Sequence, residues 1–469
     1  MVRSHDVILI AASHVSGEVV PARAQMATTL GFHIILACMG IALPTIVLAA
    51  EFIGLRRANA VALLLAQRWS QVMGVLVAVG AVTGTVLSFE MGLLWPGLMR
   101  QYGAVLGLPF GIEGVFFFLE AIFTAIYLYG WRRLGGWAHF WTGVPIAVSG
   151  ILGAMSVVAV NAWMNQPGGF TARDGRIVSV DPWQVYFNHA APYEMPHMIL
   201  AAYMVAGFTV AGVYAAGILR GRRDRYHYTG FAIPFVLAAI VTPFQIFVGD
   251  TAARAVAADQ PVKFASMEYV PRTATNVPEY VGGVYASGHV YGGLRIPGLD
   301  SLLVGFSPRT KVIGWDTVPA AARPPVPWLI HLCFDAMVGL GTLLLLVGLW
   351  ALYGWWRHRR LPRQRLFWLA GAVSGVAAIV AMEAGWVVTE VGRQPWVVYR
   401  LQTTTAAATT NGGVITSLSV VVVLYAVLGA ATLLILRTLA RRWRRSEAQE
   451  QAVPYGPPAG PRDRAGGRT

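Results

Sequence analysis

Two histidines, a methionine and several carboxylic acids interrupt the long apolar stretches of this sequence. They are His33, Glu90, Glu113, Glu120, His197, Asp335, Met337 and Glu383. An ionisable group inside a membrane helix is costly, so it marks a functional site or a buried partner. Imidazole and thioether are the usual axial ligands of an electron-transfer haem, and a single ligand leaves the iron open to a gas. From the residues alone, a haem-bearing membrane redox protein is the first hypothesis, and a proton-coupled transporter without haem is the second.

Some members of this set also have ordinary structural explanations. His33 alone could be a core histidine bonded to a carbonyl, and Met337 alone would be packing. Glu113 and Glu120 are more informative, because seven residues place both on one face of a helix and no cation accompanies them. That pair indicates a proton relay or a cofactor contact. The chain has only two cysteines, which excludes a zinc site of cysteines, a four-cysteine iron–sulfur cluster and covalent CxxCH haem attachment.

The elements that position these residues are expected to be membrane helices. The chain has 469 residues, of which 56% are hydrophobic and 12% charged, about half the charged fraction of a soluble globular protein. A water-soluble enzyme is therefore excluded. Nine apolar runs are each long enough to cross a hydrocarbon core of about 30 Å as a helix. They span 27–54, 70–94, 105–130, 139–163, 195–219, 229–249, 326–352, 367–389 and 414–436.

The net charge of +14 indicates how the chain is oriented in the membrane rather than a surface that binds nucleic acid. The arginines cluster in alternate connections between the apolar runs. Such connections are cytoplasmic, which places the N-terminus outside and the C-terminus in the cytoplasm. With this topology, the whole polar set falls in the outer half of the bilayer and predicts one buried site facing the outer surface. No removable signal peptide is expected at the N-terminus.

The resulting organisation has five parts. We predict an N-terminal extracytoplasmic segment (1–25), six transmembrane helices (26–249), a long extracytoplasmic loop (250–325), three further helices (326–441) and a disordered cytoplasmic tail (442–469). The long loop mixes glycine, proline, aromatic and charged residues. Loops of that length in compact proteins are usually functional.

Several motifs give this sequence a family resemblance. They are RWSQVMG at 68–74, GIEGVFFFLEAIF at 111–123, GWRRLG at 130–135, VNAWMNQPGGF at 160–170 and MEAGWVVTEVGRQPW at 382–396. Together with the order of the spans, they resemble subunit I of the cytochrome bd family of quinol oxidases over residues 22–440. The resemblance implies an all-α polytopic membrane protein of a bacterial inner membrane that oxidises quinol and reduces dioxygen to water, generating membrane potential. It also implies two b-type haems, usually a d-type haem, a second subunit and small single-span subunits.

The resemblance also implies roles for individual residues. His197 and Met337 fall where the family holds its low-spin haem b, and His33 and Glu383 fall where it ligates the two high-spin haems. The remaining positions are Glu113 and Glu120 at the high-spin site and its proton supply, Lys263 and Glu268 in the quinol-binding loop, and Arg393 and Trp396 of GRQPW at the cofactors.

Departures from the family pattern leave part of the assignment open. Asp335 stands where a familiar relative has arginine, Ile379 replaces an aromatic residue near the high-spin pair, and the long loop is of the shorter type. The third haem is therefore expected to be haem d or a further haem b. Lys263 and Glu268 are five residues apart, so on a helix they would point about 140° apart. We expect Glu268 to accept a quinol proton and Lys263 to orient the head group or Glu268.

Overall fold

The computed structural model describes residues 17–446 and residue 455. Nine long helices within these residues are apolar enough to cross a membrane. They are α1 (Val19–Arg56), α2 (Ala60–Leu94), α3 (Pro96–Gly130), α4 (Gly136–Asn165), α6 (Ala191–Leu219), α7 (Arg225–Asp259), α10 (Pro327–His358), α11 (Arg365–Gly392) and α13 (Val414–Ser446). Apart from residue 326, which precedes α10, each predicted span lies within one of them. The prediction of an all-α membrane fold is confirmed.

Several helices extend well beyond the predicted apolar runs. The clearest case is α7, which continues from 250 to Asp259 where the sequence predicted loop. This extension is rich in alanine, which favours helix, and an ion pair of 2.8 Å joins Asp250 to Arg254 one turn later. The predicted segment 1–25 is helical from Val19 onward, and α13 continues to Ser446, into the predicted tail. The rest of that segment and tail lie outside the described residues, apart from 17, 18 and 455.

Helix α1 lies at the centre of the bundle and packs against α2, α4, α6 and α13. Around α6, the helices α7, α10 and α11 form a second group in which α6 contacts α7 and α11, and α10 contacts α7 and α11. The buried apolar side chains of α6, α7 and α11 form a continuous core that reaches Cys38 on α1. These two helix groups meet along α1 and α6, so residues on α1 lie between them.

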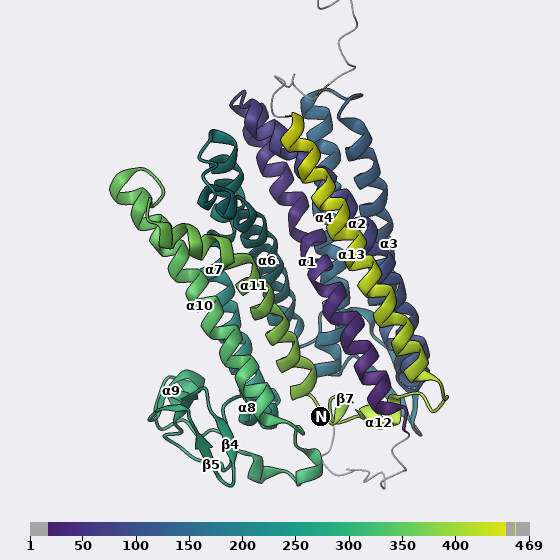
Figure 1. Ribbon diagram of the computed structural model, residues 1–469. Helices are drawn as coiled ribbons and strands as arrows, with labels where there is room; N and C mark the ends of the chain where they lie inside the picture. The colour runs from purple at the N-terminus through teal and green to yellow at the C-terminus, as the bar shows by residue number, and fades with distance from the viewer. Residues whose placement is uncertain (1–16, 447–454, 456–469) are drawn as a thin grey trace, which may run out of the picture.

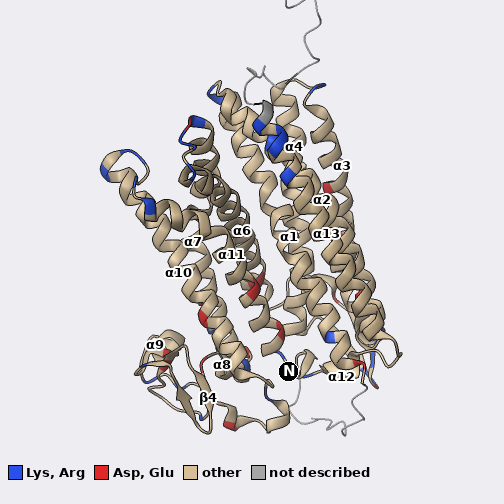
Figure 2. Ribbon diagram, viewed as in Figure 1, with Lys and Arg blue, Asp and Glu red and all other residues tan. Residues whose placement is uncertain are grey.

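The two ends of the bundle are chemically different. Figure 2 shows lysine and arginine gathered at the end where α1 joins α2 and α10 joins α11, here called the arginine-rich end. The opposite end, here called the loop end, carries the long connection between α7 and α10 and the shorter connections after α4 and α11. Most of the acidic residues lie in the half of the bundle nearer the loop end.

The long connection folds into short elements that pack on α10 and α11. It contains α8 (Pro261–Met267), α9 (Leu299–Gly305) and two 3-10 turns (Trp315–Thr317 and Ala320–Ala322). Strands β3 (Glu279–Val281) and β6 (Leu294–Ile296) pair antiparallel, and the hairpin of β4 (Val284–Ala286) and β5 (His289–Tyr291) continues from them. Other connections at this end hold β1 (Phe170–Arg173), β2 (Arg176–Val180), α5 (Pro182–Tyr186), β7 (Trp396–Val398), β8 (Gln402–Thr403) and α12 (Thr404–Ala407).

Candidate functional site

His33 on α1 is held by a threonine on α2. Its Nδ1 lies 2.9 Å from Oγ1 of Thr83. The Thr83 hydroxyl also lies within hydrogen-bond distance of the backbone carbonyls of Val79 and Gly80, and when it donates to one of them its oxygen accepts a proton carried by Nδ1. Nε2 then keeps its lone pair, which is the state in which a histidine binds a metal. A Cβ added at Gly84 would lie 3.1 Å from the imidazole, so glycine leaves the space that the ring needs.

Glu90 of α2 is bound to the same face of α1. Gln25 Nε2 and Thr29 Oγ1 both donate to its Oε1, at 2.8 and 2.9 Å. Gln25, Thr29 and His33 are spaced four residues apart, so one face of α1 carries all three. Glu90 is buried, and its second oxygen has no hydrogen-bond partner within the described part of the chain. Glu90 and His33 therefore lie along the same face of α1, and their membership of one functional site stays a prediction.

Glu120 and Glu383 contact α1 at two glycines. A Cβ at Gly40 would lie 3.5 Å from Oε1 of Glu120, and one at Gly31 would lie 3.5 Å from Oε2 of Glu383. Oε1 of Glu383 is buried without a hydrogen-bond partner, and neither carboxylate makes an ion pair among the described residues. Side chains from α2 and α11 therefore converge on the loop-end half of α1, whereas Glu120 of α3 meets α1 at Gly40, just past the middle of that helix. Glu113 lies two turns before Glu120 on the same face of α3, as predicted.

His197 and Met337 belong to the second helix group. The ring of His197, on α6, lies beside Gly249 of α7. Among the residues that the structure describes, its Nδ1 is buried without a partner and its Nε2 has one 3.4 Å contact, with the amide of Gln245. On α10, Sδ of Met337 would lie 2.9 Å from a Cβ placed at Gly385 of α11. An imidazole that the protein leaves unsatisfied and a thioether beside a glycine are a donor set that suits haem iron.

Arg393 and Lys263 lie together near the loop end of α11. Arg393 donates to Oε2 of Glu390 at 2.7 Å and to Oδ1 of Asn161 at 3.2 Å. Lys263 of α8 packs its aliphatic chain against Gly392. Burial lowers the pKa of Lys263 to about 8, while the charge of Glu194 acts in the opposite direction. Trp396 follows in β7, and its backbone N–H donates to the Arg393 carbonyl.

Glu268 is the C-cap residue of α8 and contacts a different set of side chains from Lys263. It meets Glu279 of β3 and Asp300 of α9, with one carboxylate oxygen of each within 4.8 Å of the others. Burial and the neighbouring carboxylates raise the pKa of Glu268 well above its usual value. The pKa of Glu279 is raised to about 7 and that of Asp300 to about 8, in both cases mainly by burial. Sequence reasoning missed Glu279 and Asp300 as site residues, because 11 and 32 residues separate them from Glu268 and only the hairpin of the loop brings them back.

His331 connects the long loop to α10. Its Nδ1 faces the carbonyl of Met267, while its Nε2 faces the carbonyl of Gly282 at 3.2 Å and Oδ2 of Asp335 at 3.3 Å. Asp335 in turn accepts the N–H of Gly282. The ring of Tyr269 lies 3.9 Å from the His331 ring, centroid to centroid.

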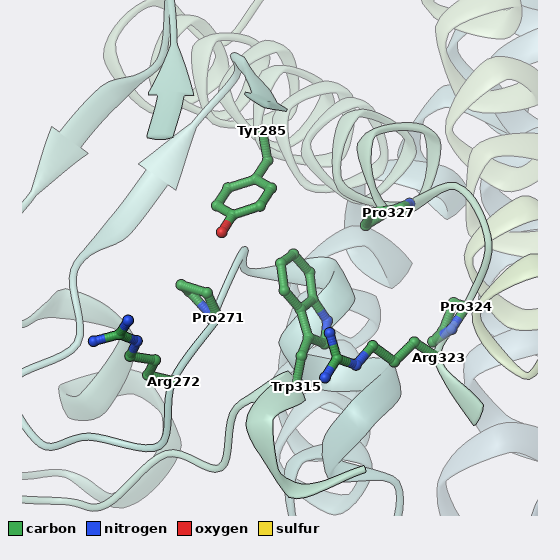
Figure 3. A pocket seen from close by; sticks show the side chains of 7 residues that line it. All are labelled: Pro271, Arg272, Tyr285, Trp315, Arg323, Pro324 and Pro327. Carbon is green, nitrogen blue, oxygen red and sulfur yellow. The ribbon is translucent and has the colours of Figure 1, made fainter. Parts of the chain in front are cut away.

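A cavity of about 390 Å³ opens at the surface of the long loop (Figure 3). The Trp315 indole lies 5.1 Å from the Tyr285 ring and donates to Ser266 of α8. None of the predicted site residues lines this cavity. Its lining consists of Pro271, Arg272, Tyr285, Trp315, Arg323, Pro324 and Pro327.

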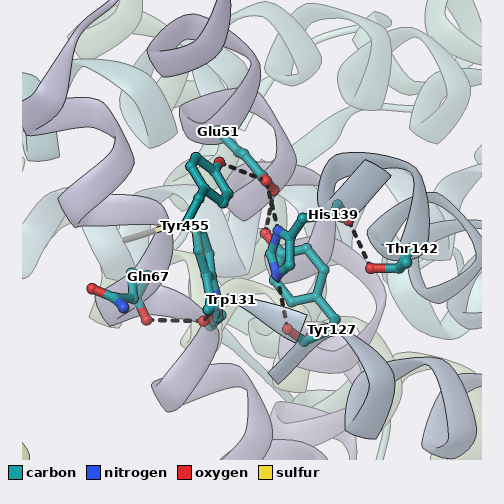
Figure 4. Close-up of polar contacts among 8 residues, drawn as sticks. Glu51, Gln67, Tyr127, Trp131, His139, Thr142 and Tyr455 are labelled. Carbon is teal, nitrogen blue, oxygen red and sulfur yellow. Dashed lines mark hydrogen bonds and ion pairs between the residues drawn. The ribbon is translucent and has the colours of Figure 1, made fainter. Parts of the chain in front are cut away.

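A second buried polar group lies at the arginine-rich end, away from the predicted site (Figure 4). Glu51 of α1 lies 2.7 Å from Nδ1 of His139 on α4 and accepts hydrogen bonds from the hydroxyls of Tyr127 and Tyr455. Nε2 of His139 donates to the Tyr127 carbonyl. Sequence analysis missed this group, although a glutamate and a histidine at the same end of two apolar runs were a usable signal. The contacts join α1, α3 and α4, and Trp131 stacks on Tyr455.

Comparisons with known proteins place these features in one family. Residues 21–443 match the model of the family described as cytochrome bd terminal oxidase subunit I. The structure of bd oxidase from Geobacillus thermodenitrificans is 34% identical with a TM-score of 0.86, and the match covers 92% of this chain and all of that one. A Bacillus subtilis chain with the provisional name cytochrome bd menaquinol oxidase subunit I is 33% identical, covering 89% of this chain and 96% of its own length.

Two further relatives carry ubiquinol in their names. Cytochrome bd ubiquinol oxidase subunit 1 of Bacillus subtilis is 28% identical over 402 residues, or 82% of this chain and 85% of the relative. Cytochrome bd-II ubiquinol oxidase subunit 1 of Escherichia coli is 26% identical over 414 residues, or 72% and 79%. The helices, the convergent ligand-type side chains and a match across nearly the whole chain agree with the resemblance found in the sequence. The chain belongs to the cytochrome bd terminal oxidase subunit I family and is a multi-pass membrane component of a bacterial quinol:oxygen oxidoreductase.

Proposed function

We propose that this chain is the haem-bearing subunit of its oxidase, taking electrons from membrane quinol near the loop end and delivering them to buried haems that reduce dioxygen. The observation that carries this proposal is the state of His33. Thr83 binds its Nδ1 and leaves Nε2 available, on a helix where Gly31 and Gly40 bring Glu383 and Glu120 close. A histidine with only a packing role would gain nothing from a fixed tautomer beside two carboxylates that have no cation.

We propose His197 and Met337 as the ligands of a low-spin haem b, and His33 and Glu383 as ligands of two high-spin haems. One of these is haem b and the other is haem d or a further haem b. When bound, the haems supply one-electron transfer and the site of dioxygen reduction. The protein's part is to fix the ligand atoms, exclude water and keep the carboxyl groups of Glu113 and Glu120 where they can pass protons inward from the arginine-rich end.

At the loop end, we propose Glu268 as the group that accepts a proton from the quinol hydroxyl. A carboxylate can take that proton and release it to water, whereas Lys263 is directed toward Glu194, Glu390 and Arg393 and helps to hold the site. Arg393 and Trp396 form the boundary between this site and the haem region. The relatives are named for menaquinol in one case and ubiquinol in two, so we propose the quinol class without a species.

The charge distribution supports the orientation proposed for the membrane. The arginine-rich end is the cytoplasmic end under the positive-inside rule, which places the long loop and the N-terminus outside. Quinol protons then leave outside while the protons that form water enter from the cytoplasm, and this separation generates membrane potential. We propose a second subunit and small single-span subunits as partners. Many apolar side chains of α10 and α13 are exposed in the isolated chain, and this is the surface that we propose such partners cover.

A reduced-minus-oxidised absorption spectrum of the purified complex tests this function. The oxidase proposal predicts b-type bands, and a proton-coupled transporter predicts no pigment. Met337→Leu then tests the ligand assignment, because leucine keeps the volume and removes only the thioether. We expect loss or a marked shift of the low-spin band, with the high-spin signals retained. An unchanged low-spin spectrum and midpoint potential would refute the assignment of Met337.

A further inference from the structure

Three acidic side chains of the long loop meet in a place where the described structure supplies no cation. Glu268 is the C-cap residue of α8, Glu279 begins β3 and Asp300 lies in the first turn of α9. Their oxygens lie within 4.8 Å of one another. Glu268 and Asp300 are only 3% and 1% exposed, while Glu279 is partly exposed. No hydrogen bond within the described residues satisfies Oε2 of Glu268, Oε2 of Glu279 or Oδ2 of Asp300, although all three atoms are buried.

The charged groups that act on this cluster are acidic. The charge of Asp335, from α10, raises the pKa of both Glu268 and Glu279, and Glu279 and Asp300 raise that of Glu268 in addition. The nearest imidazole in the network, that of His331, is engaged by Asp335 and by two backbone carbonyls. Like charges this close cannot all ionise near neutral pH, so the carboxyls titrate as a group rather than singly.

We propose that Glu268, Glu279 and Asp300 form one shared proton acceptor, which takes the proton of the oxidised quinol and releases it to water through Glu279. This inference rests on the proposed role of Glu268. It adds two residues to that role, and both act through Glu268 rather than on the quinol itself.

The proton path can be written with every atom accounted for. The two O–H bonds of the quinol break in turn. Each time, an O–H bond forms on Glu268 and one electron leaves along the oxidase's path to dioxygen, and Glu268 hands on the first proton before it receives the second. Glu268 passes its proton to its neighbour Glu279, whose carboxylate oxygen lies within 4.8 Å. Glu279, which is the partly exposed member, releases it to water. Asp300 is fully enclosed and holds a proton that moves within the cluster while Glu268 is charged. The oxidation therefore requires no base outside these three side chains.

The test compares variants of the complete oxidase complex. Asp300→Asn removes a titrating site at nearly constant volume, Asp300→Glu restores it, and Asp174→Asn is the matched control. Asp174 is exposed in the turn between β1 and β2, where its positive φ of 51° suits asparagine. Two readouts are measured: the pH profile of quinol-driven turnover, and the carboxyl C=O bands in the redox infrared difference spectrum in H₂O and D₂O.

With a shared acceptor, the rising limb of the pH profile in Asp300→Asn moves to lower pH by roughly one unit, because removing a negative neighbour makes Glu268 easier to ionise. The same variant loses part of the carboxyl band. Asp300→Glu keeps both features, and Asp174→Asn changes neither. A reduced turnover with an unshifted profile would mean that Asp300 is merely structural. A shifted profile with an unchanged carboxyl band would mean that Asp300 contributes charge but shares no proton. Either result overturns the proposal.

Two additional measurements distinguish the shared acceptor from the proposed role of Glu268 alone and from a cation site. If Glu268→Gln leaves the kinetics of quinol oxidation unchanged, the proposed function of Glu268 is wrong. If Glu268→Gln impairs the enzyme but Asp300→Asn keeps a normal pH profile, only the shared acceptor is wrong. Addition of Ca²⁺ or a chelator to the unmodified complex tests the cluster as a cation site. A profile that shifts with Ca²⁺ and a carboxyl band abolished by it would replace the proton acceptor with a metal site. We expect neither effect.

Discussion

Replacing Thr83 by valine should weaken haem binding at His33 without altering the shape of the bundle. Valine matches the volume of threonine but cannot accept the hydrogen bond from Nδ1, which is made at 2.9 Å. Thr83 is fully buried, so no water replaces the lost acceptor. A buried donor left without a partner costs about 1–3 kcal/mol. Since about 1.4 kcal/mol is a factor of ten, we expect a loss of about 10- to 100-fold in affinity for the haem held by His33, the usual range for a group that orients a metal ligand.

The matched control for this variant is Thr85→Val. Thr85 lies two residues away on α2 and is exposed, and its hydroxyl donates a hydrogen bond to the carbonyl of Ala81. Both variants are purified as the complete complex, and haem content is measured together with the high-spin bands during stepwise haem loss. Thr83→Val should lose one high-spin signal first and retain the low-spin signal, while Thr85→Val should behave as the unmodified protein. Equal haem retention in the two variants would refute the argument that Thr83 fixes the tautomer of His33.

Three further predictions concern the other parts of the site. Gly385→Ala puts a Cβ 2.9 Å from Sδ of Met337. It should therefore shift the midpoint potential of the low-spin haem in a redox titration. An unshifted potential would contradict the position assigned to the thioether. Glu120→Gln should lower oxygen turnover by about 100-fold or more with haem content retained, because it keeps the shape and removes the proton carrier, and normal turnover would end that assignment. The pKa of Glu279 is raised to about 7 and that of Asp300 to about 8. The folded loop therefore keeps protons that an unfolded loop releases near pH 4. The stability of the loop should fall as the pH rises from about 4 through about 8. Hydrogen exchange of the loop should report that loss, and protection that instead increases from about pH 5 to about pH 8 would show that the sign is wrong.

The positions of the membrane helices could be predicted because each requires a long apolar run, and composition alone reveals such a run. Helix ends were less predictable. Residues 250–259 carry charge and read as loop, but α7 continues through them because alanines and the Asp250–Arg254 pair favour helix without apolar burial. Hydropathy reports where the chain leaves the bilayer, which is a different boundary from the last helical residue.

The candidate site could be predicted in part. His33 and Glu90 were assigned to one site by depth, and the structure joins them along one face of α1. Roles for the ligand-type residues came from the family resemblance and stay predictions. The partnership of Glu268 with Asp300 could not be predicted, since 32 residues and a nested hairpin lie between them and no local pattern encodes that return. Thr83 was missed for a different reason: a threonine in an apolar helix usually bonds its own backbone, so its second role depends on the neighbouring helix.

Polar contacts of His331 and Asp335 hold the long loop against α10. Gly282, at the junction of β3 and β4, is held from both sides: its carbonyl faces the imidazole and its N–H is bound by Asp335. Asp335 precedes Met337 by two residues on the same rigid helix. A displacement of the hairpin therefore has to move α10, the helix that carries Met337, or break the hydrogen bonds of Gly282 to His331 and Asp335.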